Sequence, residues 1–279
     1  MSFDDYMRNF FLSHGRSDSV DEDVEKAKKD PFGGLYSPIV YNGGKLFAKL
    51  GFTPNKVSFI NLISSCFIFY LTIMAGIGHK SSLYSVQPLF GMLMIPCGFL
   101  VLFTGLIDGM DGAVATLTNQ KSRSGGWLDG NIDRICDVLT LVCLVPGGYL
   151  IIENWGLDFT WMIWTNVILM FVYEYMRAKH HEVGLTRSQP TMGERVTRVL
   201  LQTSFFLVYG FNSLVGFFIY LADPNAPTTD PFPLYVGEVH TLMFLFQAIL
   251  LVIMSIATIS SGKWIWDNLK KMDKENKIE

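Results

Sequence analysis

Five aspartates fall within residues 108–137, in an otherwise apolar part of the chain: Asp108, Asp111, Asp129, Asp133 and Asp137. A carboxylate at membrane depth is energetically costly, so such a residue needs a partner and usually marks a functional site. The nearby cations are Lys121, Arg123 and Arg134, which are too few to neutralise all of these carboxylates. A further positive charge, beyond that of the nearby side chains, is therefore expected beside these carboxylates.

The spacing of the aspartates predicts two acidic helix faces. Asp108 and Asp111 are three residues apart, and the later aspartates follow one another at intervals of four. Each set then lines one side of a helix. Two such faces turned toward each other would form an oxygen cage for Mg²⁺ or Mn²⁺, because both ions prefer oxygen ligands. The pattern predicts an intramembrane metal site.

The composition is typical of a polytopic membrane protein. Of 279 residues, 50% are hydrophobic and 14% aromatic, and the mean hydropathy is +0.31. An ordinary soluble domain is less apolar. Six stretches are long enough to span a bilayer, or nearly so: 57–76, 89–107, 138–152, 159–176, 199–222 and 239–259. The third reaches full length only if its helix begins near Leu128. We expect an all-α integral membrane protein with six transmembrane helices.

The chain divides into four regions by composition. Residues 1–30 form a polar arm, either a solvated helix or a loose segment. Residues 31–56 interleave apolar residues with glycine and lysine, which predicts an interfacial amphipathic helix lying on the bilayer. We expect residues 57–262 to form the six-span membrane domain that carries the aspartates, and residues 263–279 to form a C-terminal tail.

The distribution of basic residues predicts the orientation in the membrane. With six spans, only Lys80 of the 22 Lys and Arg residues lies on the side opposite the termini. The positive-inside rule then places both termini and the aspartates at the cytoplasmic face. The net charge of −3 adds little, and nothing in the sequence indicates nucleic acid as a partner.

The segment DGMDGAVATLTNQKSRSGGWLDGNIDRICD, which begins at Asp108, resembles the signature of the CDP-alcohol phosphotransferase family. That signature is D-x2-D-G-x2-A-R-x8-G-x3-D-x3-D. Its required positions are occupied here by Asp108, Asp111, Gly112, Ala115, Gly125, Asp129 and Asp133. The resemblance implies a six-span membrane enzyme, often a homodimer. Such an enzyme transfers a phospho-alcohol group from a CDP-linked donor, most often a lipid, to a hydroxyl acceptor and releases CMP.

The same resemblance implies a role for each motif aspartate. Asp108, Asp111 and Asp129 would be ligands of two divalent ions. Asp133 would contribute to the metal site and would be the base that deprotonates the acceptor hydroxyl. The small residues of the motif, Gly112, Ala115 and Gly125, would let a nucleotide approach the helix backbones. Asp137 lies outside the motif, one turn further on, and could support these residues or contact substrate.

One position departs from the family pattern. The arginine that follows the motif alanine, and that helps to bind the donor, is Thr116 in this chain. Three interpretations stay open. Lys121 or Arg123 supplies the missing charge, the donor is unusual, or the protein has weak catalytic activity.

A second basic segment, residues 175–198, is similar to the loop of family members that accept phosphorylated polyols, such as phosphatidylinositol-phosphate and phosphatidylglycerophosphate synthases. Arg177, Lys179, Arg195 and Arg198 would form a clamp for the acceptor phosphate. The alternative is that these residues only anchor the loop to anionic membrane lipids.

Three other functions remain in competition. The donor could be a soluble CDP-polyol rather than a lipid. An intramembrane prenyltransferase also uses aspartate-rich motifs with Mg²⁺, and a divalent-cation transporter also has intramembrane carboxylates. A transporter has no use for the small residues between the aspartates. Metal-dependent release of CMP would separate the phosphotransferase from the last two.

Overall fold

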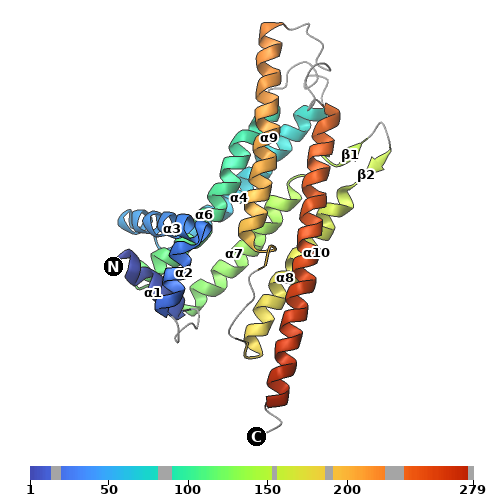
Figure 1. Cartoon of the computed structure of the whole chain (residues 1–279). Helices are drawn as coiled ribbons and strands as arrows, with labels where there is room; N and C mark the ends of the chain where they lie inside the picture. The colour runs from blue at the N-terminus through green and yellow to red at the C-terminus, as the bar shows by residue number, and fades with distance from the viewer. Residues whose placement is uncertain (14–19, 81–89, 153–155, 186–190, 224–235, 276–279) are drawn as a thin grey trace. The chain divides into compact units, whose positions relative to one another are not determined.

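The computed structural model describes residues 1–275 apart from 14–19, 81–89, 153–155, 186–190 and 224–235. The described part is almost entirely helical, as expected (Figure 1). Its elements are α1 (Phe3–Ser13), α2 (Val20–Lys29), α3 (Pro31–Lys49), α4 (Pro54–Lys80), the 3₁₀ helix η1 (Phe90–Leu93), α6 (Met94–Leu117), α7 (Arg123–Val142), β1 (Ile151–Ile152), β2 (Leu157–Asp158), α8 (Thr160–Glu182), α9 (Arg195–Ala222) and α10 (Val236–Glu275). The strands β1 and β2 pair antiparallel, with Ile151 opposite Asp158.

Four of these helices are long and apolar enough to cross a membrane, which indicates an integral membrane protein. The candidate spans are Pro54–Gly76, Gly91–Leu117, Arg195–Ile219 and Thr241–Glu275. They coincide with four of the six predicted spans. The other two predicted spans fall on α7 and α8, whose sequences carry several charged residues. Among the described residues, length and composition therefore support four spans, and six stays a prediction.

The predicted third span is wrong at its C-terminal end. The expected early start is confirmed, because α7 begins at Arg123 and contains Asp129 and Asp133. The helix ends at Val142, however, and does not continue to residue 152. The sequence Pro146-Gly147-Gly148 explains the ending, since proline cannot continue a helix and Gly148 adopts a positive φ of 65°. Successive turns replace the helix, including one closed by the Gly148 amide on the Val145 carbonyl at 3.1 Å.

The chain forms two compact units. Unit 1 comprises Met1–Ser64 and Phe103–Cys136, and unit 2 comprises Ser65–Leu102 and Asp137–Glu279. Helices α4, α6 and α7 each contribute one end to each unit. Unit 1 thus joins the two predicted N-terminal regions to the helix ends that carry the motif aspartates.

The N-terminal segment is packed helix rather than a loose arm. Helices α1 and α2 bury one apolar face each in the core of unit 1: Tyr6, Met7, Phe11 and Val24. The Tyr6 and Tyr41 rings lie 5.4 Å apart, and the Tyr41 hydroxyl donates to the Met1 carbonyl at 2.8 Å. The polar composition of residues 1–30 is therefore confined to the outer faces of these helices.

Helix α3 has two different apolar faces. On one face, Gly43 and Gly44 let its backbone approach α6 closely, and a Cβ on Gly44 would lie 2.6 Å from the Ala113 Cβ. On the other face, Leu35, Ile39 and Leu46 are exposed, followed by Leu50 directly after the helix end. An uncovered apolar face is what the interfacial-helix prediction requires.

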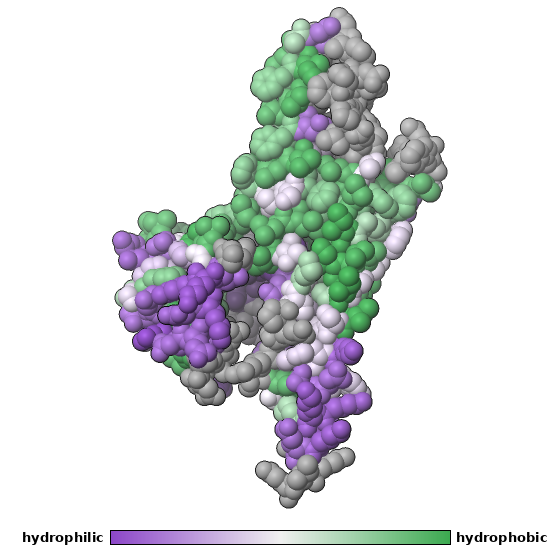
Figure 2. All heavy atoms as spheres, viewed as in Figure 1, coloured by the Kyte–Doolittle hydropathy of each residue, from purple (hydrophilic) through white to green (hydrophobic). Residues whose placement is uncertain are grey.

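The core of unit 2 lies between α8, α9, α10 and the unit 2 ends of α4 and α6. Its largest buried side chains include Tyr149, Tyr173, Phe206, Tyr209 and Phe246. Asn166 of α8 donates to the side-chain oxygen of Gln247 of α10 at 2.8 Å, a polar link inside this core. Figure 2 shows an apolar surface along α9 and the adjoining part of α10, and a hydrophilic surface at the C-terminal end of α10.

Candidate active site

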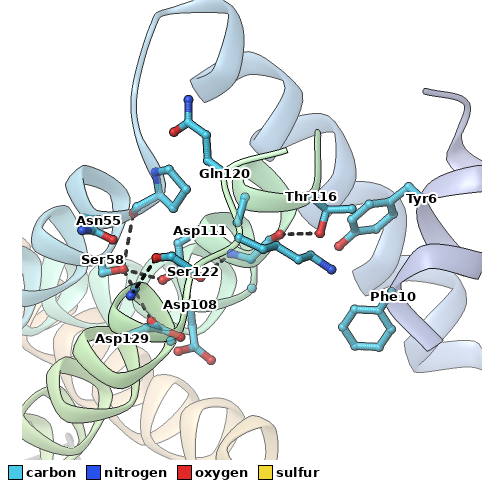
Figure 3. Close-up of a pocket in the computed structure, with 17 residues that line it drawn as sticks. Tyr6, Phe10, Asn55, Ser58, Asp108, Asp111, Thr116, Gln120, Ser122 and Asp129 are labelled. Carbon is cyan, nitrogen blue, oxygen red and sulfur yellow. Dashed lines mark hydrogen bonds between the residues drawn. The ribbon is translucent and has the colours of Figure 1, made fainter. Parts of the chain in front are cut away.

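A cavity of about 390 Å³ opens in unit 1 where three helix ends meet (Figure 3). The start of α4, the end of α6, the start of α7 and the connection 118–122 between α6 and α7 supply most of its wall, and α1 supplies Tyr6 and Phe10. Its lining includes three of the motif aspartates: Asp108, Asp111 and Asp129. Both acidic helix faces predicted from the sequence thus reach one cavity.

The carboxylates of α6 and α7 meet at a hydroxyl of α4. Ser58 Oγ donates to Asp111 Oδ2 at 2.6 Å and lies 3.5 Å from Asp129 Oδ1. Asp111 is buried, and the negative charges of Asp108 and Asp133 also act on it. Asp133 is half-buried and does not line the cavity. The result is a concentration of negative charge inside an apolar helix cluster.

These residues fit a divalent cation by their chemistry. Among the described residues, no three Asp, Glu, His or Cys side chains already surround a point as ligands of a bound ion do. The carboxylate oxygens are nevertheless the hard donors that Mg²⁺ and Mn²⁺ prefer. Gly112 provides a space beside them, because a Cβ added there would meet no atom within 4 Å. Asp108, Asp111, Asp129 and Asp133 are the residues that would hold such an ion.

Most of the predicted donor-binding residues also line the cavity: Gly112, Ala115, Thr116, Lys121 and Gly125. Arg123, the first residue of α7, is exposed and does not line it. The Thr116 hydroxyl donates to the Gly112 carbonyl at 2.8 Å. A Cβ on Gly125 would lie 2.9 Å from Ser122 Oγ, so a larger residue would displace the hydroxyl that accepts from the Gly125 amide at 3.0 Å.

Sequence reasoning missed two groups of lining residues. Asn55 and Ser58 come from α4, and Tyr6 and Phe10 come from α1. The first group has a signal in the sequence, because Asn55, Ser58 and Asn61 recur every three residues at the start of a largely apolar helix. The second has none, since aromatic residues four positions apart usually pack in a core.

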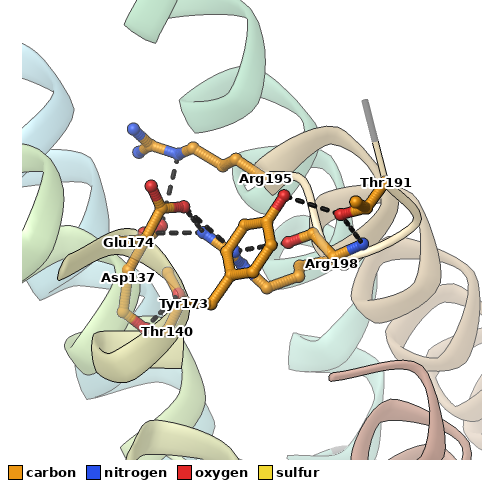
Figure 4. A network of polar contacts seen from close by, with 8 residues as sticks. Asp137, Thr140, Tyr173, Glu174, Thr191, Arg195 and Arg198 are labelled. Atoms are coloured by element: carbon orange, nitrogen blue, oxygen red, sulfur yellow. Dashed lines mark hydrogen bonds and ion pairs between the residues drawn. The ribbon is translucent and has the colours of Figure 1, made fainter. Parts of the chain in front are cut away.

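A second polar cluster lies in unit 2 around Asp137 (Figure 4). Arg198 Nη2 lies 2.9 Å from Asp137 Oδ2 and 3.3 Å from Glu174 Oε1, and Arg195 Nε lies 3.3 Å from Asp137 Oδ1. Arg198 also donates to the Gly193 carbonyl at 2.8 Å. Two arginines and two carboxylates cancel in charge, and all four side chains are largely buried.

This cluster contains two of the four residues predicted to bind an acceptor phosphate. Arg195 and Arg198 come together on Asp137. Lys179 instead pairs with Glu182 at 2.5 Å on an exposed part of α8, and the Arg177 guanidinium lies 5.6 Å from the centre of the Tyr173 ring. Asp137, which the sequence left without a definite role, is the residue that holds both arginines.

The pairing of two aspartate faces around a cavity agrees with the comparison of the sequence with known families. The family model described as CDP-alcohol phosphatidyltransferase matches residues 52–266. The chain belongs to the CDP-alcohol phosphatidyltransferase family. It is therefore an enzyme, a transferase of phospholipid biosynthesis, and the prenyltransferase and cation-transporter alternatives are set aside.

Curated relatives of this CDP-alcohol phosphatidyltransferase include two archaeal enzymes. The archaetidylinositol phosphate synthase of Pyrococcus horikoshii is 26% identical over 171 residues, which cover 61% of this chain and 76% of the relative. The archaetidylinositol phosphate synthase of Aeropyrum pernix is 28% identical over 172 residues, which cover 58% and 78%.

Solved structures share the fold. The phosphatidylinositol phosphate synthase of Mycobacterium tuberculosis in complex with manganese and citrate aligns with a TM-score of 0.55 at 19% identity, covering 81% of this chain and 88% of that one. The same enzyme with CDP-DAG bound aligns with a TM-score of 0.51, also at 19% identity, covering 82% and 94%. Helices α1 and α2 and all of α3 lie before the segment that the family model matches.

Proposed function

We propose that this transferase moves a phosphatidyl-type group from a CDP-linked lipid to a hydroxyl of a phosphorylated polyol and releases CMP. The observation that carries the proposal is the meeting of Asp111 and Asp129, from two helices, at Ser58 inside a cavity. The names of the archaeal relatives and the CDP-DAG bound to the mycobacterial enzyme support the choice of donor and acceptor.

The chemistry follows from the carboxylates. The acceptor oxygen attacks the β-phosphorus of the donor, the bond from that phosphorus to the bridging oxygen breaks, and CMP leaves with the bridging oxygen. Asp133 takes the proton of the acceptor hydroxyl. Two ions, Mg²⁺ or Mn²⁺, would neutralise the diphosphate and the leaving phosphate as Lewis acids. Asp108, Asp111, Asp129 and Asp133 would hold them, and Ser58 orients two of these carboxylates.

The acceptor site is assigned to the Asp137 cluster. Arg195 presents a fork of donors that suits a phosphate, and Asp137 fixes its direction. Arg198 holds Asp137 from the other side. Arg177 and Lys179 would join on the approach of an anionic acceptor, since both lie on the last turns of α8.

The membrane arrangement completes the proposal. Helices α7 and α8 would cross the bilayer with their charged residues facing protein, which raises the number of spans from four to six. The exposed apolar face of α3 would lie in the interface, and the active site and both termini would face the cytoplasm. The enzyme would act as a homodimer, as the family resemblance implies.

The reaction is tested by CMP release from purified protein with CDP-diacylglycerol and either Mn²⁺ or Mg²⁺. The acceptors are inositol phosphate, glycerol phosphate, serine and free inositol, and CDP-glycerol serves as a soluble donor. We expect turnover with the lipid donor and one phosphorylated polyol. Asp111→Asn should lower turnover by at least about 1000-fold while the protein stays folded. The matched control is Asp267→Asn, at an exposed residue of α10. Full activity of Asp111→Asn would exclude the metal assignment.

The acceptor assignment has its own test. Arg195→Ala should raise the KM for the phosphorylated acceptor by about tenfold or more, with little change in the KM for the donor. An unchanged acceptor KM would remove Arg195 from the site and favour the lipid-anchoring alternative.

A further inference from the structure

Part of the active-site wall comes from outside the family-matched segment. Tyr6 and Phe10 of α1 line the cavity together with Asp108, Asp111 and Thr116 (Figure 3). They are four residues apart and so lie on one face of α1. Tyr6 is only 4% exposed, whereas Phe10 is 41% exposed. The family match begins at residue 52, so this part of the wall lies before the matched segment.

Helix α1 is held in place mainly by its buried residues Tyr6, Met7 and Phe11. The Tyr6 ring packs against Tyr41, and the Arg8 and Asp21 side chains form an ion pair at 2.9 Å between α1 and α2. Lys28 of α2 reaches Asp4 of α1 at 2.6 Å. Several contacts along the length of α1 therefore keep its aromatic face at the cavity.

The Tyr6 hydroxyl can donate a hydrogen bond to a ligand in the cavity. Within the part of the chain that the structure describes, it makes no hydrogen bond, and Figure 3 shows it turned toward Thr116. Burial raises the pKa of Tyr6 to about 12, so the phenol keeps its proton at neutral pH. The Thr116 hydroxyl already donates its hydrogen bond to the Gly112 carbonyl. A ligand at this end of the cavity would meet one hydroxyl donor and one partly exposed aromatic ring.

The cavity thus has two chemically different ends. Carboxylates suited to metal ions line one end, and the aromatic pair from α1 lines the other (Figure 3). A nucleoside diphosphate has the matching construction, with a metal-binding diphosphate at one end and a flat base at the other. The volume of about 390 Å³ is within the usual range for a small-molecule site.

We infer that α1 forms the base-binding wall of the donor site, with the nucleobase against Phe10 and the Tyr6 hydroxyl donating to the base or the ribose. The inference rests on the proposed function, because it assumes that the diphosphate binds at the aspartates. It extends that function by assigning nucleoside recognition to a segment that the family match does not include.

The test compares two probes on the full-length protein in detergent with Mn²⁺. CDP carries the base, ribose and diphosphate, whereas inorganic pyrophosphate carries the diphosphate alone. Phe10→Ala should weaken CDP binding by about five- to tenfold in calorimetry, since stacking on an aromatic ring contributes on this order. Tyr6→Phe should weaken it by about threefold to tenfold. Pyrophosphate binding should stay within about twofold of the wild type for both variants.

Two control variants distinguish a loss of ligand contacts in the cavity from a general destabilisation of α1. Leu12→Ala truncates an exposed apolar residue of the same helix that does not line the cavity. Tyr41→Phe removes a hydroxyl from the same aromatic cluster, again outside the cavity. Both should bind CDP as the wild type does.

The possible outcomes separate the inference from the proposed function. Equal losses for CDP and pyrophosphate, or no loss for CDP, would overturn the inference while leaving CMP release as the proof of the function. A loss seen with CDP-diacylglycerol but not with CDP would assign the wall to the lipid and would also overturn it. A wild-type protein that binds neither probe and releases no CMP would overturn both.

Discussion

At Gly112, the effect of a substitution on ligand binding can be measured separately from its effect on stability. Gly112 lies within α6 and lines the cavity, and an added Cβ would meet no protein atom within 4 Å. Alanine is about 1 kcal/mol more favourable than glycine inside a helix. Gly112→Ala should therefore leave the melting temperature unchanged or raised, and should weaken CDP binding because the methyl group occupies the ligand's space.

The control for this prediction is Gly130→Ala. Gly130 also has open space around it, but it lies on α7 away from the cavity lining. Calorimetry measures CDP binding by both variants, and thermal unfolding measures their melting temperatures. If the two variants bind CDP equally well, Gly112 has no part in the donor site.

Arg198 is the residue on which the unit 2 cluster depends. It contacts both Asp137 and Glu174 and is buried. Arg198→Ala would leave two buried carboxylates with less compensating charge, so we expect a loss of about 3–5 kcal/mol in the free energy of unfolding. Asp137→Asn combined with Arg198→Gln should lose less than the sum of the two single variants.

Unfolding of each variant in detergent measures this effect. Lys179→Ala is the matched control, because it breaks an ion pair that is exposed on both sides and should change stability little. Equal stability of Arg198→Ala and Lys179→Ala would show that the cluster is not structural.

At the scale of secondary structure, the packing of α3 on α6 positions the first two motif aspartates. The contact depends on small residues, since Gly44 faces Ala113 and Gly43 faces Met110. Gly44→Leu would force the helices apart and should destabilise the protein by about 1–3 kcal/mol or more. CMP release should fall as well, because α6 carries Asp108 and Asp111.

Asn42→Leu is the control, since it introduces the same side chain at an exposed position of α3. Thermal unfolding and CMP release of both variants test the prediction. A Gly44→Leu protein as stable and active as Asn42→Leu would mean that α6 is positioned independently of α3.

At the scale of the whole molecule, the number of spans has a direct test. Four and six spans both place the two termini on one side of the membrane. They differ at the β1–β2 hairpin, which six spans put on the opposite side. We expect Asp158→Cys to react with a membrane-impermeant thiol reagent from the side opposite that for Ser2→Cys and Lys274→Cys, which matches the distribution of basic residues.

The unsubstituted protein with its four native cysteines gives the background for this labelling. Reaction of Asp158→Cys from the same side as the termini would mean that α7 and α8 do not cross the bilayer.

The sequence predicted helices well where local rules act. The aspartates lie on α6 and α7, as their spacing of three and four residues predicted. This spacing matches the helical repeat, which is set by the local backbone. The predicted end of the third span at residue 152 is wrong, because it follows the apolar run 138–152, whereas α7 ends at Val142, before Pro146-Gly147-Gly148. The helix obeys the local backbone constraint rather than the hydropathy of the run.

By itself, the sequence determined the chemistry of the site: the identity and spacing of the carboxylates, the family they imply and the membrane setting. The tertiary structure decided which distant residues join them. Ser58 meets Asp111 across 53 positions, Arg198 meets Asp137 across 61, and Tyr6 reaches the cavity from the first helix. The helical period is set by backbone geometry within a few residues, whereas these meetings depend on how whole helices pack, which no local pattern records.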